Sequence, residues 1–138
     1  MPSTHKNKTF ATLLALSLGG VGAHRFYLKG MQDRWGWLHL GSVPLSGLLI
    51  SLGSDWPALF TITPLILSIL AGFLEALVLG LTPDEKWDAQ HNRDSGRQSS
   101  SGWPLAVLLV LTLGVGATAL IAMLARTFDI LFTGGAYG

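Results

Sequence analysis

Apolar residues along the chain gather in four segments that are separated by short polar stretches. The longest uncharged run lies between Arg97 and Arg126 and holds 28 residues. Its stretch from Trp103 to Ala125, folded as a helix with a rise of about 1.5 Å per residue, is long enough to cross a hydrocarbon core of roughly 30 Å. A segment inside lipid has to satisfy its own backbone hydrogen bonds, so it has to be helical. This pattern predicts an all-α membrane protein.

The other apolar segments run over Phe10–Ala23, Trp35–Leu52 and Pro57–Leu81. The second and third are long enough to span, provided that neighbouring helices accommodate Pro44. The first has only 14 residues, about 21 Å as a helix, and its glycines at 19, 20 and 22 weaken its second half. We therefore predict three spanning helices and a short N-terminal membrane helix that is partial, re-entrant or fully crossing, which gives three to four transmembrane helices.

The Lys and Arg residues predict which side of the membrane each connection faces. Residues 24–34 carry three of them and residues 83–102 another three, whereas residues 53–56 carry none. Connections rich in positive charge stay in the cytoplasm, so residues 24–34 and 83–102 are predicted to be cytoplasmic, with residues 53–56 and the C-terminus outside. A re-entrant first segment places eight cations inside against Arg126 outside, and a spanning one places six against three. A cleaved signal peptide over residues 1–23 is the competing interpretation of the first segment.

The cytoplasmic connection at 83–102 has the signals of a short surface helix followed by a linker. The stretch Thr82 to Glu85 predicts a helix start whose N-cap is the Thr82 hydroxyl, and this helix is expected to end near Asn92. Trp87 on this helix suits the membrane interface. The Ser- and Gly-rich residues 94–102 predict a flexible linker into the last apolar segment.

Composition narrows the class of protein. With 49% hydrophobic and 12% charged residues, the chain is too apolar for an ordinary soluble domain. The net charge of +1 and the short clusters of cations beside apolar segments give no reason to propose a nucleic-acid partner. The chain has no cysteine, and it shows no phosphate loop, no nucleophile elbow and no paired carboxylates within a single apolar segment. We therefore expect no catalytic site, no cofactor and no metal, and a function that is not enzymatic.

The most specific local motif follows the glycines of the first segment. Those glycines let the chain bend or a neighbour approach closely, and the residues after them place cations among aromatic rings at the membrane surface. Arg25 is expected to pair with a lipid phosphate, with Asp33, or with the Phe26 or Tyr27 face of a neighbouring segment. The residues predicted to contact lipid or a partner protein are His24, Arg25, Phe26, Tyr27 and Lys29.

Glu75 is the one acid well inside an apolar segment. An ionisable group at such a position is costly and often marks a functional residue. Its expected partners are His39, Arg25 and Lys86, and His39 is the second polar residue predicted to lie within the membrane. A role in holding helices together, a contact with a partner or lipid, and a proton or ion relay all remain open.

Small residues recur at four-residue spacing in the last two apolar segments. Small side chains on one helix face allow backbones to approach closely in lipid. The two rows predict helix packing, either within the chain or with another subunit. They consist of Ser68, Gly72, Ala76 and Gly80 in one segment, and of Gly114, Thr118 and Ala122 in the other.

The N-terminal half resembles the TM2 domain family. The resemblance rests on three features: an apolar segment led by a lysine, a Gly-rich break, and a His-Arg-Phe-Tyr-Leu box before the next membrane helix. In this chain the segment begins at Lys8-Thr9, the break is Leu18-Gly19-Gly20 with Gly22, and the box is residues 24–28, followed by Gly36-Trp37-Leu38. It extends over residues 6–82, with Glu75 where the family usually has an aspartate, and it implies a helical hairpin protein of the bacterial inner membrane. We divide the chain into a TM2-like membrane domain (1–82), the short helix and linker (83–102), and an additional transmembrane helix with a short tail from Thr127 (103–138).

Three hypotheses for function follow. The first is an accessory or scaffolding subunit of the inner membrane that packs against other membrane proteins or against copies of itself. The second is a homo-oligomeric proton or ion pathway that uses Glu75. The third is binding of anionic membrane lipids through the box at residues 24–27.

Overall fold

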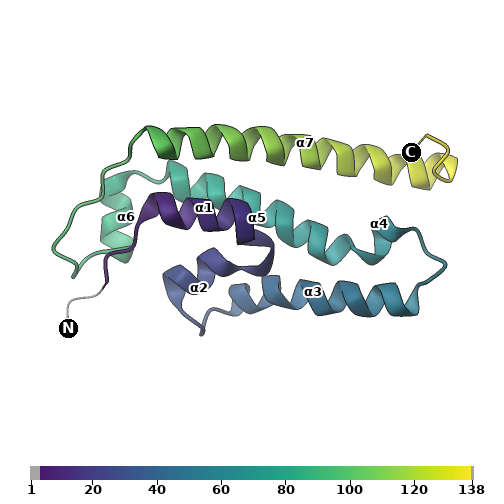
Figure 1. Cartoon of the computed structure of the whole chain (residues 1–138), viewed down its shortest axis with the longest axis horizontal. Helices are drawn as coiled ribbons and strands as arrows, with labels where there is room; N and C mark the ends of the chain where they lie inside the picture. Colours follow the sequence, from purple (N-terminus) through teal and green to yellow (C-terminus); the bar gives the residue numbers. More distant parts are fainter. Residues whose placement is uncertain (1–3, 138) are drawn as a thin grey trace.

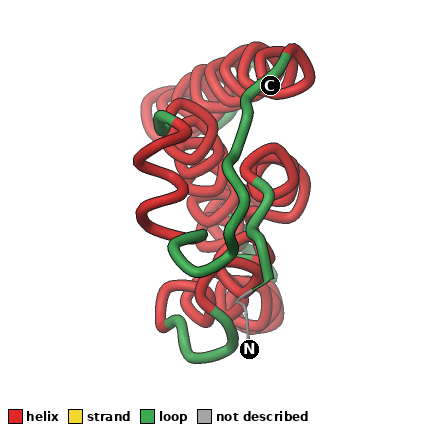
Figure 2. The backbone as a smooth tube through the Cα atoms, turned by 90° about the vertical axis from the view of Figure 1, so that its left-hand side faces the viewer, coloured by secondary structure: helices red, strands yellow, loops and turns green. Residues whose placement is uncertain are grey.

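The computed structural model describes residues 4–137, and every regular element in that range is helical (Figure 2). In chain order the elements are α1 (Lys8–Leu18), the 3₁₀ turn η1 (Gly19–Val21), α2 (Ala23–Lys29), α3 (Arg34–Leu52), α4 (Ala58–Thr61), α5 (Thr63–Leu81), α6 (Asp84–His91) and α7 (Trp103–Thr133). Figure 1 shows α3, α5 and α7 running along the long axis, with α1 and α2 beside one half of them and α6 at that same end.

The first apolar segment is a short helical hairpin. α1 begins beside α6, with the Asn7 side chain accepting a hydrogen bond of 2.9 Å from the Phe10 backbone N–H, and its 11 residues reach about 16 Å. The chain then turns through η1 and Gly22, whose φ of 75° suits glycine, and α2 runs back toward the end it came from (Figure 1). The segment thus goes only partway along the bundle and doubles back. Residues 24–28, which the sequence places at the membrane surface without specifying their local structure, form a helix.

The row of small residues on α5 packs inside the chain. Ser68, Gly72, Ala76 and Gly80 are the buried residues of this helix. At Gly72 the backbones of α5 and η1 are so close that an added Cβ would lie 2.8 Å from the Gly19 backbone. The row on α7 behaves differently, because Gly114, Thr118 and Ala122 are exposed, while α7 faces α5 with Leu105, Leu109, Thr112 and Gly116.

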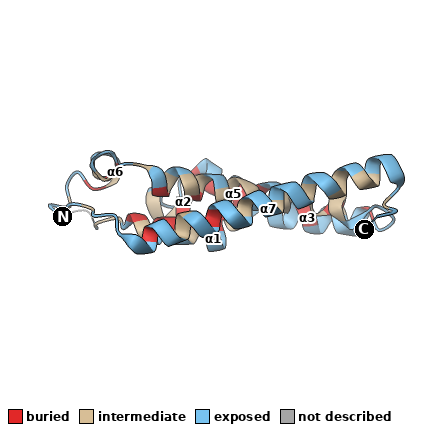
Figure 3. Cartoon of the chain, turned by 90° about the horizontal axis from the view of Figure 1, so that it is seen from above, coloured by how far each residue is buried: buried red, intermediate tan, exposed pale blue. Residues whose placement is uncertain are grey.

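Large apolar side chains cover the outside of the bundle, and mostly small or polar ones fill its inside. Figure 3 shows how little of α7 is buried. Two helices are long and apolar enough to cross a membrane, α5 and α7, and only 22% and 6% of their most apolar windows are buried. Soluble proteins bury such helices, so this distribution is that of a membrane protein. α3 has the same length as α5 but falls short of that apolarity, because residues such as Arg34 and His39 lower its hydropathy.

Two of the predicted segment boundaries were wrong. The segment expected at Pro57–Leu81 is broken at Ile62, because Pro64 lacks a backbone N–H and fits only near the start of a new helix, here the first turn of α5. The last segment does not end at Ala125. α7 continues to Thr133 because Arg126 pairs with an acid one turn further on, and Gly134 with a φ of 70° ends the helix.

α6 folds back over the start of the chain. Trp87, predicted at the membrane interface, is instead completely buried, because its ring covers the N-terminal segment and its indole N–H donates to the Lys6 carbonyl at 3.0 Å. The Asn92 side chain accepts from the Lys6 backbone N–H at 2.7 Å. Lys8 pairs with Asp84 and donates to the Thr82 carbonyl at 2.8 Å. The chain start is thereby fastened to α6.

The linker after α6 is fastened as well, a contact that the prediction of a flexible linker did not foresee. The backbone N–H of Ser99 donates to Asp88 at 2.7 Å, and that of Ser101 donates to Asp84 at 2.8 Å. The hydrogen bonds from Lys8 and Ser101 lower the pKa of Asp84 to about 2, so it stays charged at neutral pH. Thr82 does not cap α6 as predicted, because its hydroxyl donates back to the Val78 carbonyl of α5 at 2.6 Å.

Gly72→Ala is expected to destabilise the fold by about 1–3 kcal/mol, because the new methyl group meets the Gly19 backbone and neither backbone yields without shifting a helix. The measurement is the free energy of unfolding in detergent micelles titrated with SDS. Gly114→Ala is the matched control, since no described atom lies within 4 Å of its added Cβ. Equal stability of the two variants would contradict the close approach of η1 and α5.

Candidate functional site

Glu75 lies at the centre of a cluster of charged and polar side chains from α2, α3 and α5. The Nε of Arg25 donates to both carboxylate oxygens, at 2.9 and 3.0 Å, and Nη2 of the same guanidinium also pairs with the carboxylate. His24 contacts the second oxygen through Nε2. The Nε2 of His39 lies 3.7 Å from the first oxygen. Lys86, the other expected partner, is exposed on α6 and takes no part.

The bend at Gly22 brings the two N-terminal members of this cluster into place. His24 and Arg25 come two and three residues after Gly22 and lie in the first turn of α2. A Cβ at Gly22 would lie 2.8 Å from the Gly36 carbonyl oxygen and 3.0 Å from Cβ of His39. Only glycine therefore lets η1 rest on α3 at this point, and that contact sets how α2 faces α5.

Further polar groups connect the cluster to the backbone. Asp33 caps α3 by accepting from the Gly36 N–H at 2.9 Å, and one of its oxygens lies 3.5 Å from Nη1 of Arg25. The Ser68 hydroxyl donates to the Gly20 carbonyl at 2.7 Å and lies 2.7 Å from Nδ1 of His39. α3, η1 and α5 are thus joined through side chains that the sequence places far apart.

The hydrogen bonds indicate where the protons reside. Because the one hydroxyl hydrogen of Ser68 goes to Gly20, Nδ1 of His39 must carry the proton of their shared bond. His24 is 1% exposed, and among residues 4–137 its Nδ1 has no partner. Burying an N–H without an acceptor costs more free energy than burying a nitrogen lone pair without a donor. The geometry therefore favours neutral His24 with its hydrogen on Nε2, which donates to Glu75. Arg25 and Glu75 then balance each other's charge.

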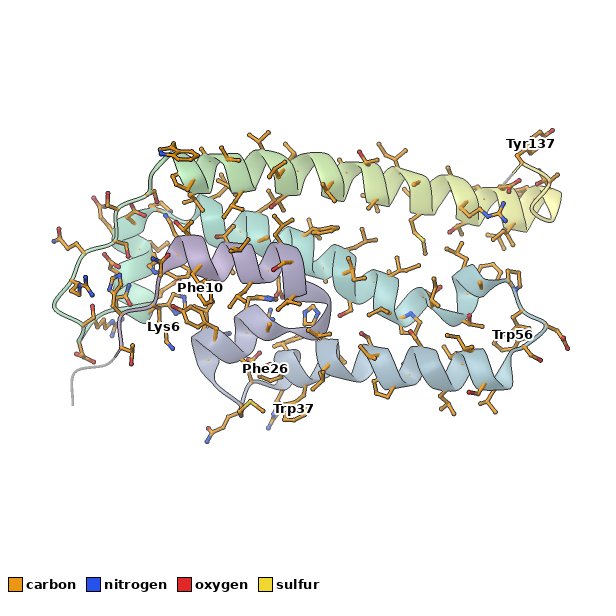
Figure 4. All side chains as sticks on the ribbon, in the orientation of Figure 1. Lys6, Phe10, Phe26, Trp37, Trp56 and Tyr137 are labelled. Carbon is orange, nitrogen blue, oxygen red and sulfur yellow. The ribbon has the colours of Figure 1, made fainter. Side chains whose placement is uncertain are left out.

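The aromatic members of the predicted contact set pack within the protein. Phe26 lies over Gly36 and meets Trp37 edge-on, with ring centroids 5.6 Å apart (Figure 4). The Tyr27 hydroxyl accepts from the Asn7 N–H at 2.9 Å. The last member, Lys29, ends α2 and is exposed. Of the expected partners of Arg25, the structure shows Asp33 and an aromatic face, although the ring is that of Trp35, 5.9 Å away.

Glu75 forms part of the wall of two open cavities. One, the α3–α5 groove, has a volume of about 510 Å³ and is mostly apolar, with Trp35 and Leu67 among its lining residues. The other, the α2–α6 pocket, has a volume of about 450 Å³ and is lined by His24, Arg25, Leu28, Lys29, Glu75, Val78, Leu79, Gln90 and His91. Within the described part of the chain, no three His, Asp or Glu side chains are placed to hold a metal ion.

Two contributors to the cluster were given other roles in the sequence analysis. Asp33 was foreseen only as a partner of Arg25, although an acid three residues before Gly36 is a usual helix cap. Ser68 was assigned to helix packing and not to a hydrogen bond with His39. The glycines at 19, 20 and 22 indicated that the chain bends, but no local sequence pattern predicted how far the helix after the bend would extend.

Part of the N-terminal half matches a known family. Residues 4–53 match the TM2 domain, a stretch that includes α1, α2 and α3 but not Glu75. Searches of curated proteins and of solved structures gave no match.

Glu75→Gln is expected to lower the free energy of unfolding by about 3 kcal/mol, because it leaves the guanidinium of Arg25 partly buried without its carboxylate. SDS titration of the purified protein measures this. Glu85→Gln is the control, since Glu85 is exposed on α6 and should change stability by less than about 0.5 kcal/mol.

A double-mutant cycle makes the test specific to the pair. Once Arg25 is Gln, replacing Glu75 is expected to cost much less than in the natural protein. If the loss from Glu75→Gln stayed the same in both backgrounds, the ion pair would not be what holds α2 to α5.

Proposed function

Residues 4–53 match the TM2 domain, and from this premise we propose that the chain is a non-enzymatic integral protein of the bacterial inner membrane. Its role in the proposal is that of an accessory or scaffolding subunit, which packs against other membrane proteins or against copies of itself. The support comes from the distribution of charge, from the state of the Glu75 cluster and from the outer face of α7.

In the proposed arrangement α3, α5 and α7 cross the membrane, and the α1–α2 hairpin enters it partway from the side of α6. That end gathers eight of the nine Lys and Arg residues, because the chain start, the α2–α3 turn and the linker all meet there (Figure 1). The opposite end has Arg126. An excess of cations favours the cytoplasm, so the α6 end is proposed to lie inside.

The Glu75 cluster supports a role in holding the helices together over one as a proton relay. A relay needs a carboxyl that exchanges its proton readily, whereas Arg25 binds Glu75 through two nitrogens and stabilises the charged form. The cluster joins α2, α3 and α5, and each of its described members has a neighbour within the chain. This arrangement is typical of a structural contact that holds helices together.

The observation that carries the scaffolding proposal is the outer face of α7. Gly114 and Thr118 on this helix lie away from the face that packs on α5, whereas Ala122 lines a pocket between α7 and α5; all three residues are exposed. Among the described residues nothing lies within 4 Å of a Cβ built on Gly114. Another helix would be able to approach closely there, in the way that Gly72 lets η1 approach α5.

The proposed sidedness is tested with single cysteines, because the chain has none of its own. Ser54→Cys is expected to react with a membrane-impermeant maleimide on intact cells, and Arg93→Cys only after the membrane is opened. The Lys29→Cys variant should behave like Arg93→Cys, because residues 24–34 are proposed to lie on the same side as α6. Labelling of positions 29 and 93 but not of 54 in intact cells would reverse the orientation.

Association through α7 is tested by photo-crosslinking in native membranes. A benzophenone attached to Thr118→Cys is expected to give one adduct of defined mass, which identifies either a second copy or another membrane protein. Gly114→Leu should abolish this adduct, because a large side chain prevents the close approach. Ala117→Cys is the control, as position 117 is exposed on a different face of α7. Equal adducts from 117 and 118, or none from 118, would overturn the proposal.

A further inference from the structure

The α2–α6 pocket combines two kinds of lining. Leu28, Val78 and Leu79 form an apolar wall, and two of these belong to the last turn of α5. Lys29 and His91, at the ends of α2 and α6, supply polar groups on the other side. Because α5 is one of the two helices apolar enough to cross a membrane, its last turn lies where hydrocarbon gives way to headgroups.

The polar side of this pocket has a surplus of positive charge. His91 is half-buried on the Trp87 ring, and its pKa is lowered by burial and by the nearby charges of Lys29 and Lys6. Lys6 lies over the Tyr27 ring and not beside an acid. Among the residues that line the pocket in the described chain, Glu75 is the sole acid, and Arg25 already neutralises it.

We infer that the α2–α6 pocket binds the phosphate group of an anionic phospholipid, with Lys29 and His91 toward the phosphate and Leu28, Val78 and Leu79 along the start of an acyl chain. A soluble phosphate compound shares the phosphate chemistry, but it would leave the apolar wall unused. The inference does not depend on whether α7 binds a partner, since the pocket lies at the other side of α5.

Native mass spectrometry of the detergent-purified protein, titrated with phosphatidylglycerol, tests this inference. The natural protein is expected to hold one phosphatidylglycerol in preference to phosphatidylcholine. Lys29→Gln should weaken phosphatidylglycerol binding about tenfold, the usual effect of losing one charged hydrogen bond. Lys86→Gln is the matched control: it removes the same charge at the same end of the bundle, from an exposed position outside the pocket, and should weaken binding less than twofold.

Two further measurements decide between the sources of the phosphate and localise the site. Glycerol 3-phosphate is expected to displace the lipid poorly, even at high excess. The pKa of His91, followed by NMR in micelles, should rise when phosphatidylglycerol is added. Equal effects of Lys29→Gln and Lys86→Gln, equal retention of the two lipids, displacement by glycerol 3-phosphate, or an unchanged His91 pKa would each overturn the assignment.

Discussion

The ion pair between Arg25 and Glu75 ties together parts of the chain that lie 50 residues apart in sequence. In an apolar environment charged groups of this kind are stable only when they meet, so the pair dictates where α2 can lie against α5. Once α2 is placed, His24 lies beside the same carboxylate and Asp33 comes within reach of the guanidinium. The packing of α2, α3 and α5 around Glu75 follows from this contact.

Close backbone packing provides the space that the ion pair needs. The glycines at 19 and 72 allow η1 and α5 to touch, and Gly22 allows η1 to rest on α3. Larger residues at these positions would separate the helices by the width of a side chain. The guanidinium would then no longer span the distance to the carboxylate. The small glycines and the ion pair therefore depend on each other to hold these helices in place.

Much of the fold was predictable, because hydrophobic length and helical periodicity are properties of the local sequence. The helical class and the existence of each apolar segment followed from them, and the short helix near residues 84–91 followed from the helix-start signals just before it. The length of the first segment and its glycines allowed several topologies. The reversal into α2 depends on contacts with α3 and α5, which no local pattern contains. The break at Ile62, by contrast, had its signal in Pro64.

The candidate site, too, was predictable from the sequence only in part. Glu75 was identifiable because an acid in an apolar segment is rare, and Arg25 and His39 were among its expected partners. Which of those partners it meets depends on distances across the bundle. Trp87 shows the limit most clearly: a tryptophan near a membrane boundary is usually interfacial, but here the ring is completely buried and its indole N–H donates to the Lys6 carbonyl. A single sequence does not reveal that the chain start will pack against this tryptophan.

The way the chain start is held has a consequence for synthesis. Lys6 is bound by Trp87 and Asn92, and Arg25 by Glu75. While the ribosome is still producing the first half of the protein, none of these partners exists. The N-terminal hairpin therefore waits at the membrane, with its charged and polar groups unsatisfied, until α5 and α6 have been made. The segment that leaves the ribosome first is thus among the last to reach its final position.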